Sequence, residues 1–77
     1  MPRDFTPFYQ RVIDAIVADI AAGRLRPGDQ LPATAALADR YGYSVGTVRK
    51  AIETLIERDV LRGHQGVGVF VADHPVT

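Results

Sequence analysis

The chain has 77 residues, of which 47% are hydrophobic and 23% are charged, and this length suits one small globular domain over residues 1–77. It contains no cysteine, which excludes disulfides and thiolate zinc sites, and nine basic residues balance nine acidic ones. No apolar stretch approaches the roughly 20 residues of a membrane span, so we expect a cytoplasmic protein without a membrane partner. Binding to nucleic acid would therefore have to rest on a local excess of positive charge.

The first predicted element is a helix over residues 7–22. Thr6 followed by Pro7 is typical of an N-cap and a first helical position, because the missing N–H of proline costs nothing there. Apolar residues then recur at helical spacing and predict one buried face, with Asp19 among the residues off that face. Gly23 favours a left-handed end to the helix. The predicted buried face consists of Val12, Ile13, Ile16, Val17 and Ile20.

A turn and a second helix are expected next. The run RPGD at residues 26–29 places proline and glycine at the centre of a type II turn, where glycine accepts a positive φ at low cost. A short extended pairing strand is expected around Gln30 and Leu31. Residues 34–41 predict a second helix, because three residues share one face and Gly42 ends the pattern. These three residues are Leu37, Ala38 and Tyr41.

A third helix and a hairpin complete the predicted fold. The hydroxyl of Ser44 can cap a helix over residues 45–58, and five apolar residues form a stripe along it. Residues 60–72 then have three glycines between β-branched and aromatic residues, which is the composition of a hairpin with a glycine-rich tip. Only Gly42 and Tyr43 separate the second helix from the third, so the order of elements predicts an α+β winged helix-turn-helix. The stripe of the third helix is Val48, Ala51, Ile52, Leu55 and Ile56.

Three segments of the chain carry a resemblance to a known family. They are IAAGRLRPGDQLP at residues 20–32, LADRYGYSVGTVRKAIETL at residues 37–55 and QGVGVFV at residues 65–71. In this order and spacing they resemble the DNA-binding domain of the GntR-type bacterial transcription regulators, from about residue 8 to residue 71. The resemblance implies a winged helix whose third helix enters the major groove and whose wing reaches the adjacent minor groove or the backbone. It also implies a homodimer on a palindromic operator in double-stranded DNA, with repression as the expected role.

The charge pattern supports the same surface. From Arg40 to Ile52 the chain has three cations and no acidic residue, so this segment would attract phosphate. Ser44, Thr47 and the free N–H groups of the first helical turn favour a phosphate oxygen. Arg49 can reach a base edge or a phosphate, and arginine can meet guanine with two parallel hydrogen bonds. The expected DNA contacts are Thr34, Arg40, Ser44, Val45, Gly46, Thr47, Arg49, Lys50, Arg62, His64, Gln65 and Gly66.

The sequence departs from the family pattern where cations are common. Ala35, Val45 and Val67 stand at such positions, and three lost phosphate contacts would flatten the salt dependence of binding by about three units of slope. The run LPATA also stands where the family has LPSER, which removes the capping box of the second helix. Gly46 fits common family variants. Because it has no side chain, it allows DNA to approach the helix closely, at a cost of about 1 kcal/mol in helix propensity.

Several alternatives stay open on the residues alone. Thr47 can hydrogen-bond back to its own helix, and a histidine such as His64 at a turn can be inert. Catalysis has little support, because the two histidines and the carboxylates form no recognisable pair, so we expect no enzyme, no cofactor and no metal. The run GHQGVGV also lacks the lysine and the strand-to-helix context of a phosphate loop.

The rival interpretation is a winged helix used for protein contacts, for example as the partner of a full-length regulator. The zero net charge and the missing arginines favour it. The family usually adds a C-terminal effector-binding domain, for which 77 residues leave no room. Either an excised DNA-binding domain or a minimal regulator is compatible with this length.

Overall fold

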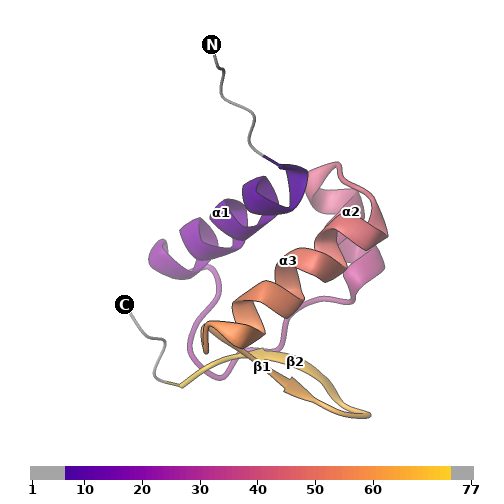
Figure 1. The fold of residues 1–77 in the computed structure, drawn as a ribbon. Helices are drawn as coiled ribbons and strands as arrows, with labels where there is room; N and C mark the ends of the chain where they lie inside the picture. Colours follow the sequence, from indigo (N-terminus) through magenta and orange to yellow (C-terminus); the bar gives the residue numbers. More distant parts are fainter. Residues whose placement is uncertain (1–6, 74–77) are drawn as a thin grey trace.

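The structure is a computed structural model that describes residues 7–73, and over these residues the chain forms three helices followed by two strands (Figure 1). The strands pair antiparallel and form a wing that starts at the C-terminal end of the last helix and runs back below it in Figure 1. The predicted α+β winged helix-turn-helix is therefore confirmed. The elements are α1 (Phe8–Ala21), α2 (Thr34–Tyr41), α3 (Val45–Glu57), β1 (Leu61–His64) and β2 (Gly68–Val71).

One hydrophobic core joins the three helices to the base of the wing. Leu61 and Val71 face each other in the register of the two strands, and both are buried. Burying a side chain of this kind stabilises the fold by roughly 1.5–3 kcal/mol before the entropy cost is subtracted. The largest fully buried side chains are Val12, Ile16, Leu37, Val48, Leu55, Leu61 and Val71.

The start of α1 differs from the prediction. Pro7 is the N-cap, with φ −58° and ψ 149°, and the helix begins at Phe8, whereas Thr6 lies outside the described residues. The carbonyl of Pro7 accepts from the N–H of Gln10 at 3.1 Å, as a capping residue does. Val17, predicted to be buried, is 43% exposed because it follows the fully buried Ile16 and lies about 100° further round the helix.

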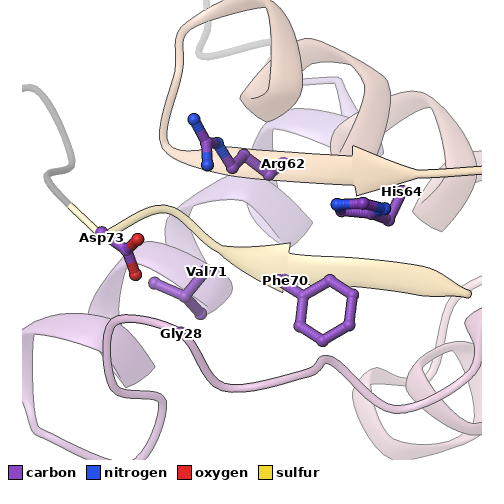
Figure 2. A pocket seen from close by; sticks show the side chains of 6 residues that line it. All are labelled: Gly28, Arg62, His64, Phe70, Val71 and Asp73. Carbon is purple, nitrogen blue, oxygen red and sulfur yellow. The ribbon is translucent and has the colours of Figure 1, made fainter.

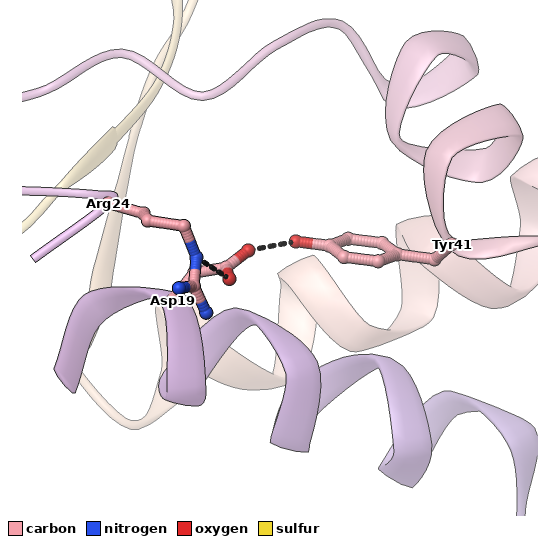
Figure 3. A network of polar contacts seen from close by, with 3 residues as sticks. All are labelled: Asp19, Arg24 and Tyr41. Carbon is pink, nitrogen blue, oxygen red and sulfur yellow. Dashed lines mark hydrogen bonds and ion pairs between the residues drawn. The ribbon is translucent and has the colours of Figure 1, made fainter. Parts of the chain in front are cut away.

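Asp19 also differs from the prediction for α1. It is only 7% exposed, although the apolar pattern placed it off the buried face. Its carboxylate accepts a hydrogen bond of 2.8 Å from Nε of Arg24 and another of 2.8 Å from the hydroxyl of Tyr41 (Figure 3). These partners supply the hydrogen bonds that a buried carboxylate requires. The contact joins the last turn of α1 to the last residue of α2.

The segment between α1 and α2 contributes a third strand-like edge to the wing. Gly28 has φ +86° and the N–H of Asp29 donates to the carbonyl of Arg26 at 2.9 Å, which fits the predicted type II turn. Gln30 then forms an antiparallel bridge with Phe70, as the expected pairing strand near residues 30–31 requires. As a result, β2 has backbone neighbours on both sides.

Contacts between residues close in sequence set the end of α2 and the start of α3. Gly42 has φ +79° and donates its N–H to the carbonyl of Ala38 at 2.9 Å, which ends α2. Ser44 caps α3 by accepting from the N–H of Thr47. At the start of α2, Ala33 is the N-cap and provides no side-chain hydrogen bond, as the altered LPATA run predicts. Among the helices of the described segment, none has the length and the apolar character that crossing a membrane requires.

Candidate nucleic-acid interface

Six of the predicted DNA contacts lie in the first half of α3 and its cap. Ser44 accepts from the N–H of Thr47 at 3.2 Å and donates its own hydroxyl to Oγ1 of Thr47 at 2.9 Å. The Thr47 hydroxyl is thus engaged within the helix, while the N–H groups of Val45 and Gly46 have no acceptor in the first turn. These two donors, at the positive end of the helix, suit an anionic oxygen. The six residues are Ser44, Val45, Gly46, Thr47, Arg49 and Lys50.

Arg49 is the exposed cation of this surface. Within residues 7–73 the one ion pair joins Asp19 to Arg24, so the Arg49 guanidinium has no carboxylate partner there. Its five donors are therefore available for a base edge or a phosphate.

Lys50 points to a different flank of α3. Its Nζ lies 5.0 Å from the ring centroid of Tyr9 on α1, a cation–π contact worth roughly 0.5–1 kcal/mol at an exposed site. Consecutive helical residues are about 100° apart, which separates this direction from that of Arg49. Tyr9 could not be identified from the sequence, because no local pattern relates a residue in α1 to one in α3.

Arg40 lies in the last turn of α2. Its guanidinium carbon lies 6.0 Å from the ring centroid of Tyr41, at the end of α2. Its charge also contributes to lowering the pKa of Asp19, to which Tyr41 donates. Arg40 therefore lies beside the Asp19–Tyr41 contact, and its part in DNA binding stays a prediction.

An open hollow lies between α2 and the first turn of α3. Val45 forms one edge of it and is 38% exposed. The α2 side is made of small residues, and no lysine or arginine lines the hollow. The residues that line it are Ala35, Ala36, Ala38, Asp39, Gly42, Tyr43, Ser44 and Val45.

Thr34 lies at a second groove, between the start of α2 and the tip of the wing. Val67 and Gly68 line the opposite side of this groove. The side-chain amide of Gln30 donates to the carbonyl of Val67 at 3.1 Å and so ties the tip to the segment before α2. Sequence reasoning missed Gln30 as a positioning residue, because nothing local pairs it with the wing.

The outer face of the wing carries Arg62 and His64 from β1, which lie on the same side of the strand (Figure 2). They border a hollow of about 270 Å³ that is also lined by Phe70 and Asp73. The ring of His64 packs edge-on against that of Phe70, with 6.1 Å between their centroids. A phosphate at this hollow would meet a carboxylate as well as a guanidinium, so this face is less favourable for DNA than that of Arg49.

Gln65 and Gly66 occupy the turn between the two strands. The N–H of Val67 donates to the carbonyl of His64 at 3.0 Å and closes this turn. The wing tip is therefore built from Gln65, Gly66 and Val67, and Val67 is its large apolar side chain, at 60% exposure. Among residues 7–73, no three His, Asp or Glu side chains gather as metal ligands.

Comparison with known proteins gives one consistent family. Residues 8–71 match the family of bacterial regulatory proteins, gntR family. The mannosyl-D-glycerate transport/metabolism system repressor MngR of Escherichia coli (strain K12) is 41% identical over 70 residues, which cover 91% of this chain and 29% of that protein. The histidine utilization repressor of Klebsiella aerogenes is 40% identical over 67 residues, covering 87% of this chain and 28% of that protein. The chain thus spans less than a third of the length of these relatives.

Solved structures resemble the whole fold, wing included. The DNA-binding domain of AraR in complex with operator ORR3 is 34% identical, with a TM-score of 0.82 over 94% of this chain and 88% of that one. A transcriptional regulator from Oenococcus oeni is 28% identical, with a TM-score of 0.87 over 97% of this chain and 62% of that one. On the match over residues 8–71 and the likeness to these relatives, the chain belongs to the GntR family of bacterial regulatory proteins.

Proposed function

We propose that this chain binds double-stranded DNA as the DNA-binding domain of a transcription regulator. The observation that carries the proposal is the likeness, over 94% of the chain, to the AraR DNA-binding domain in complex with its operator. In this arrangement α3 enters the major groove with its capped N-terminus, and the wing lies at the adjacent minor groove or the backbone. Arg49 and the free first-turn N–H groups supply the donors for base edges and phosphates.

The finer part of the proposal is repression by a homodimer on a palindromic operator. MngR and the histidine utilization relative are both named repressors, which supports this role. One protomer presents one α3, so a palindrome of two half-sites needs two protomers about one helical turn apart, roughly 34 Å. A cytoplasmic location belongs to the same proposal.

The experiment that tests DNA binding is selection of bound duplexes from a random pool with the purified chain. We expect enrichment of one sequence, with an affinity that falls as salt rises and a log–log slope of about −0.9 for each phosphate neutralised. Failure to bind any duplex at low salt would contradict the proposal and favour the protein-contact interpretation, for which the exposed Val45 and Val67 would be apolar contacts.

The dimer has a separate test on the selected site. Inserting about five base pairs between the half-sites turns them to opposite faces of the duplex, because one helical turn takes about 10.5 base pairs. We expect a large loss of affinity for the lengthened site, down to the affinity for a single half-site. An unchanged affinity for the lengthened site would contradict the dimer while leaving DNA binding intact.

A further inference from the structure

Val45 is an apolar residue at the N-terminal end of α3 that lies outside the hydrophobic core. It is 38% exposed, whereas Val48 and Ile52, which continue the apolar residues of the helix, are 0% and 6% exposed. It follows the capping Ser44 directly and is the first residue of α3. Under the proposed function, this is the end of the helix that enters the major groove.

The hollow beside the Val45 side chain disfavours a phosphate. None of the residues that line the hollow beside it is lysine or arginine, and Asp39 adds a negative charge. A phosphate oxygen there would be repelled by the carboxylate and would lose water against apolar surface. Ala35 and Ala36 are among the small residues on the α2 side of this open hollow, so an uncharged group can approach Val45 there.

The edges of the bases in the major groove offer one apolar group. Guanine presents two acceptors, adenine an acceptor and a donor, and cytosine a donor, whereas thymine presents a C5-methyl group beside its O4 acceptor. Val45 has no side-chain donor, so a guanine facing this side chain would lose water at N7 and O6 without gaining a side-chain hydrogen bond. A thymine methyl would instead bury apolar surface against the valine and the α2 alanines.

We infer that Val45 reads a thymine methyl group in the major groove, and that the chain selects thymine over guanine at the base pair beneath the first turn of α3. This inference rests on the proposed function and assigns a base preference within it. The first turn of α3 then discriminates by apolar contact, while Arg49 further along the helix provides the charged contact.

The test uses the duplex selected from the random pool and replaces its thymines with deoxyuridine, one at a time, which removes the methyl group alone. One position in each half-site is expected to lose about 2- to 4-fold in affinity, the effect of one buried methyl group. In Val45→Ala, the same replacement is expected to change the affinity by less than about 1.5-fold, because the methyl has lost its partner.

Val67→Ala is the matched control, because it shortens another exposed valine, at the wing tip rather than in α3. It is expected to keep the full loss at the thymine that Val45 reads. A second variant, Val45→Arg, is expected to change the base selected at that position from thymine to guanine, since arginine can pair with O6 and N7. Circular dichroism of each variant checks that it is folded.

The possible outcomes distinguish a failure of this inference from a failure of the proposed function on which it rests. If no duplex is bound, the proposed function fails. If a duplex is selected but no thymine shows a methyl effect that Val45→Ala removes, the inference is overturned and DNA binding stands. Selection of guanine by the wild type at the pair whose identity changes in Val45→Arg would overturn it as well.

Discussion

The hydroxyl of Tyr41 donates a hydrogen bond of 2.8 Å to one carboxylate oxygen of Asp19, and Nε of Arg24 donates to the other at the same distance (Figure 3). Each oxygen of this buried carboxylate thus has its own partner. The contact ties the end of α2 to the end of α1, and through α2 it supports the position of α3.

Tyr41→Phe is expected to lower the free energy of unfolding by about 1–3 kcal/mol, because a buried charged acceptor loses a hydrogen bond. Urea unfolding followed by circular dichroism measures this change. Tyr9→Phe is the control, since the Tyr9 hydroxyl makes no hydrogen bond to another residue of the described segment and its ring still faces Lys50. Equal destabilisation by the two substitutions would contradict the role of the Tyr41 hydroxyl.

Acid should weaken the fold through Asp19. Burial alone would raise the pKa of its carboxyl, but the hydrogen bonds from Arg24 and Tyr41 and the nearby positive charges outweigh burial and lower the pKa below 3.8. The stabilisation is therefore present above the unfolded value of 3.8 and is lost as the pH falls through the lower folded value. We expect the stability difference between wild type and Asp19→Asn, measured by urea unfolding, to shrink on acidification.

High pH should weaken the same contact by ionising Tyr41. Burial, together with the hydrogen bond to Asp19 and its negative charge, raises the pKa of Tyr41 from 10.0 to about 12. A raised folded-state pKa means that this stabilisation is complete below pH 10.0 and is lost as the pH rises towards about 12. The stability advantage of wild type over Tyr41→Phe should decline across this interval in urea titrations. A constant advantage would argue against the shift.

Substitutions at the N-caps of α2 and α3 are expected to change the stability in opposite directions. Ser44→Ala removes the acceptor for the N–H of Thr47 and should cost about 0.5–2 kcal/mol. Ala33→Ser adds a hydroxyl at the N-cap of α2, where no side chain caps the helix, and should stabilise by a similar amount. Thermal unfolding compares both with wild type, and a destabilising Ala33→Ser would show that the site does not accept the cap.

Arg49→Ala should weaken binding to the selected duplex by about 1–3 kcal/mol, because it removes the guanidinium that contacts a base or a phosphate. Arg58→Ala is the matched control, since it removes the same charge at the opposite end of α3, where Arg58 is the C-cap. Fluorescence anisotropy titrations at two salt concentrations measure both variants. If the two lose affinity equally, the effect is one of net charge and Arg49 makes no specific contact.

Most of the fold could be predicted from the sequence because its boundaries are set by local chemistry. Gly42 ends α2 and Ser44 caps α3 through contacts within a few residues, and the hairpin follows from glycines between β-branched residues. The helical period of 3.6 residues identified most of the core but not Asp19, because its partners Arg24 and Tyr41 lie outside α1. A polar residue that tertiary contacts satisfy leaves no signal in an apolar pattern.

The surface was harder to predict than the core for a related reason. The charge pattern grouped Arg40, Arg49 and Lys50, but the structure directs Lys50 towards Tyr9 and Arg40 towards Tyr41. The direction of Lys50 depends on Tyr9, a neighbour that comes from another helix. A count of cations along the sequence does not contain this information.

The bridge between Gln30 and Phe70 has a consequence for the order in which the molecule assembles. Its two ends enclose the whole of α2 and α3, so it closes a long loop of chain, and such closure costs entropy before the pairing is gained. We expect the helices to pack first and the wing to be sealed last, by the backbone bonds of Leu31 and Val71 to their partners across the sheet. Amide hydrogen exchange at these two residues should then precede exchange at Val48 and Leu55, so the wing can open transiently while α3 stays in place.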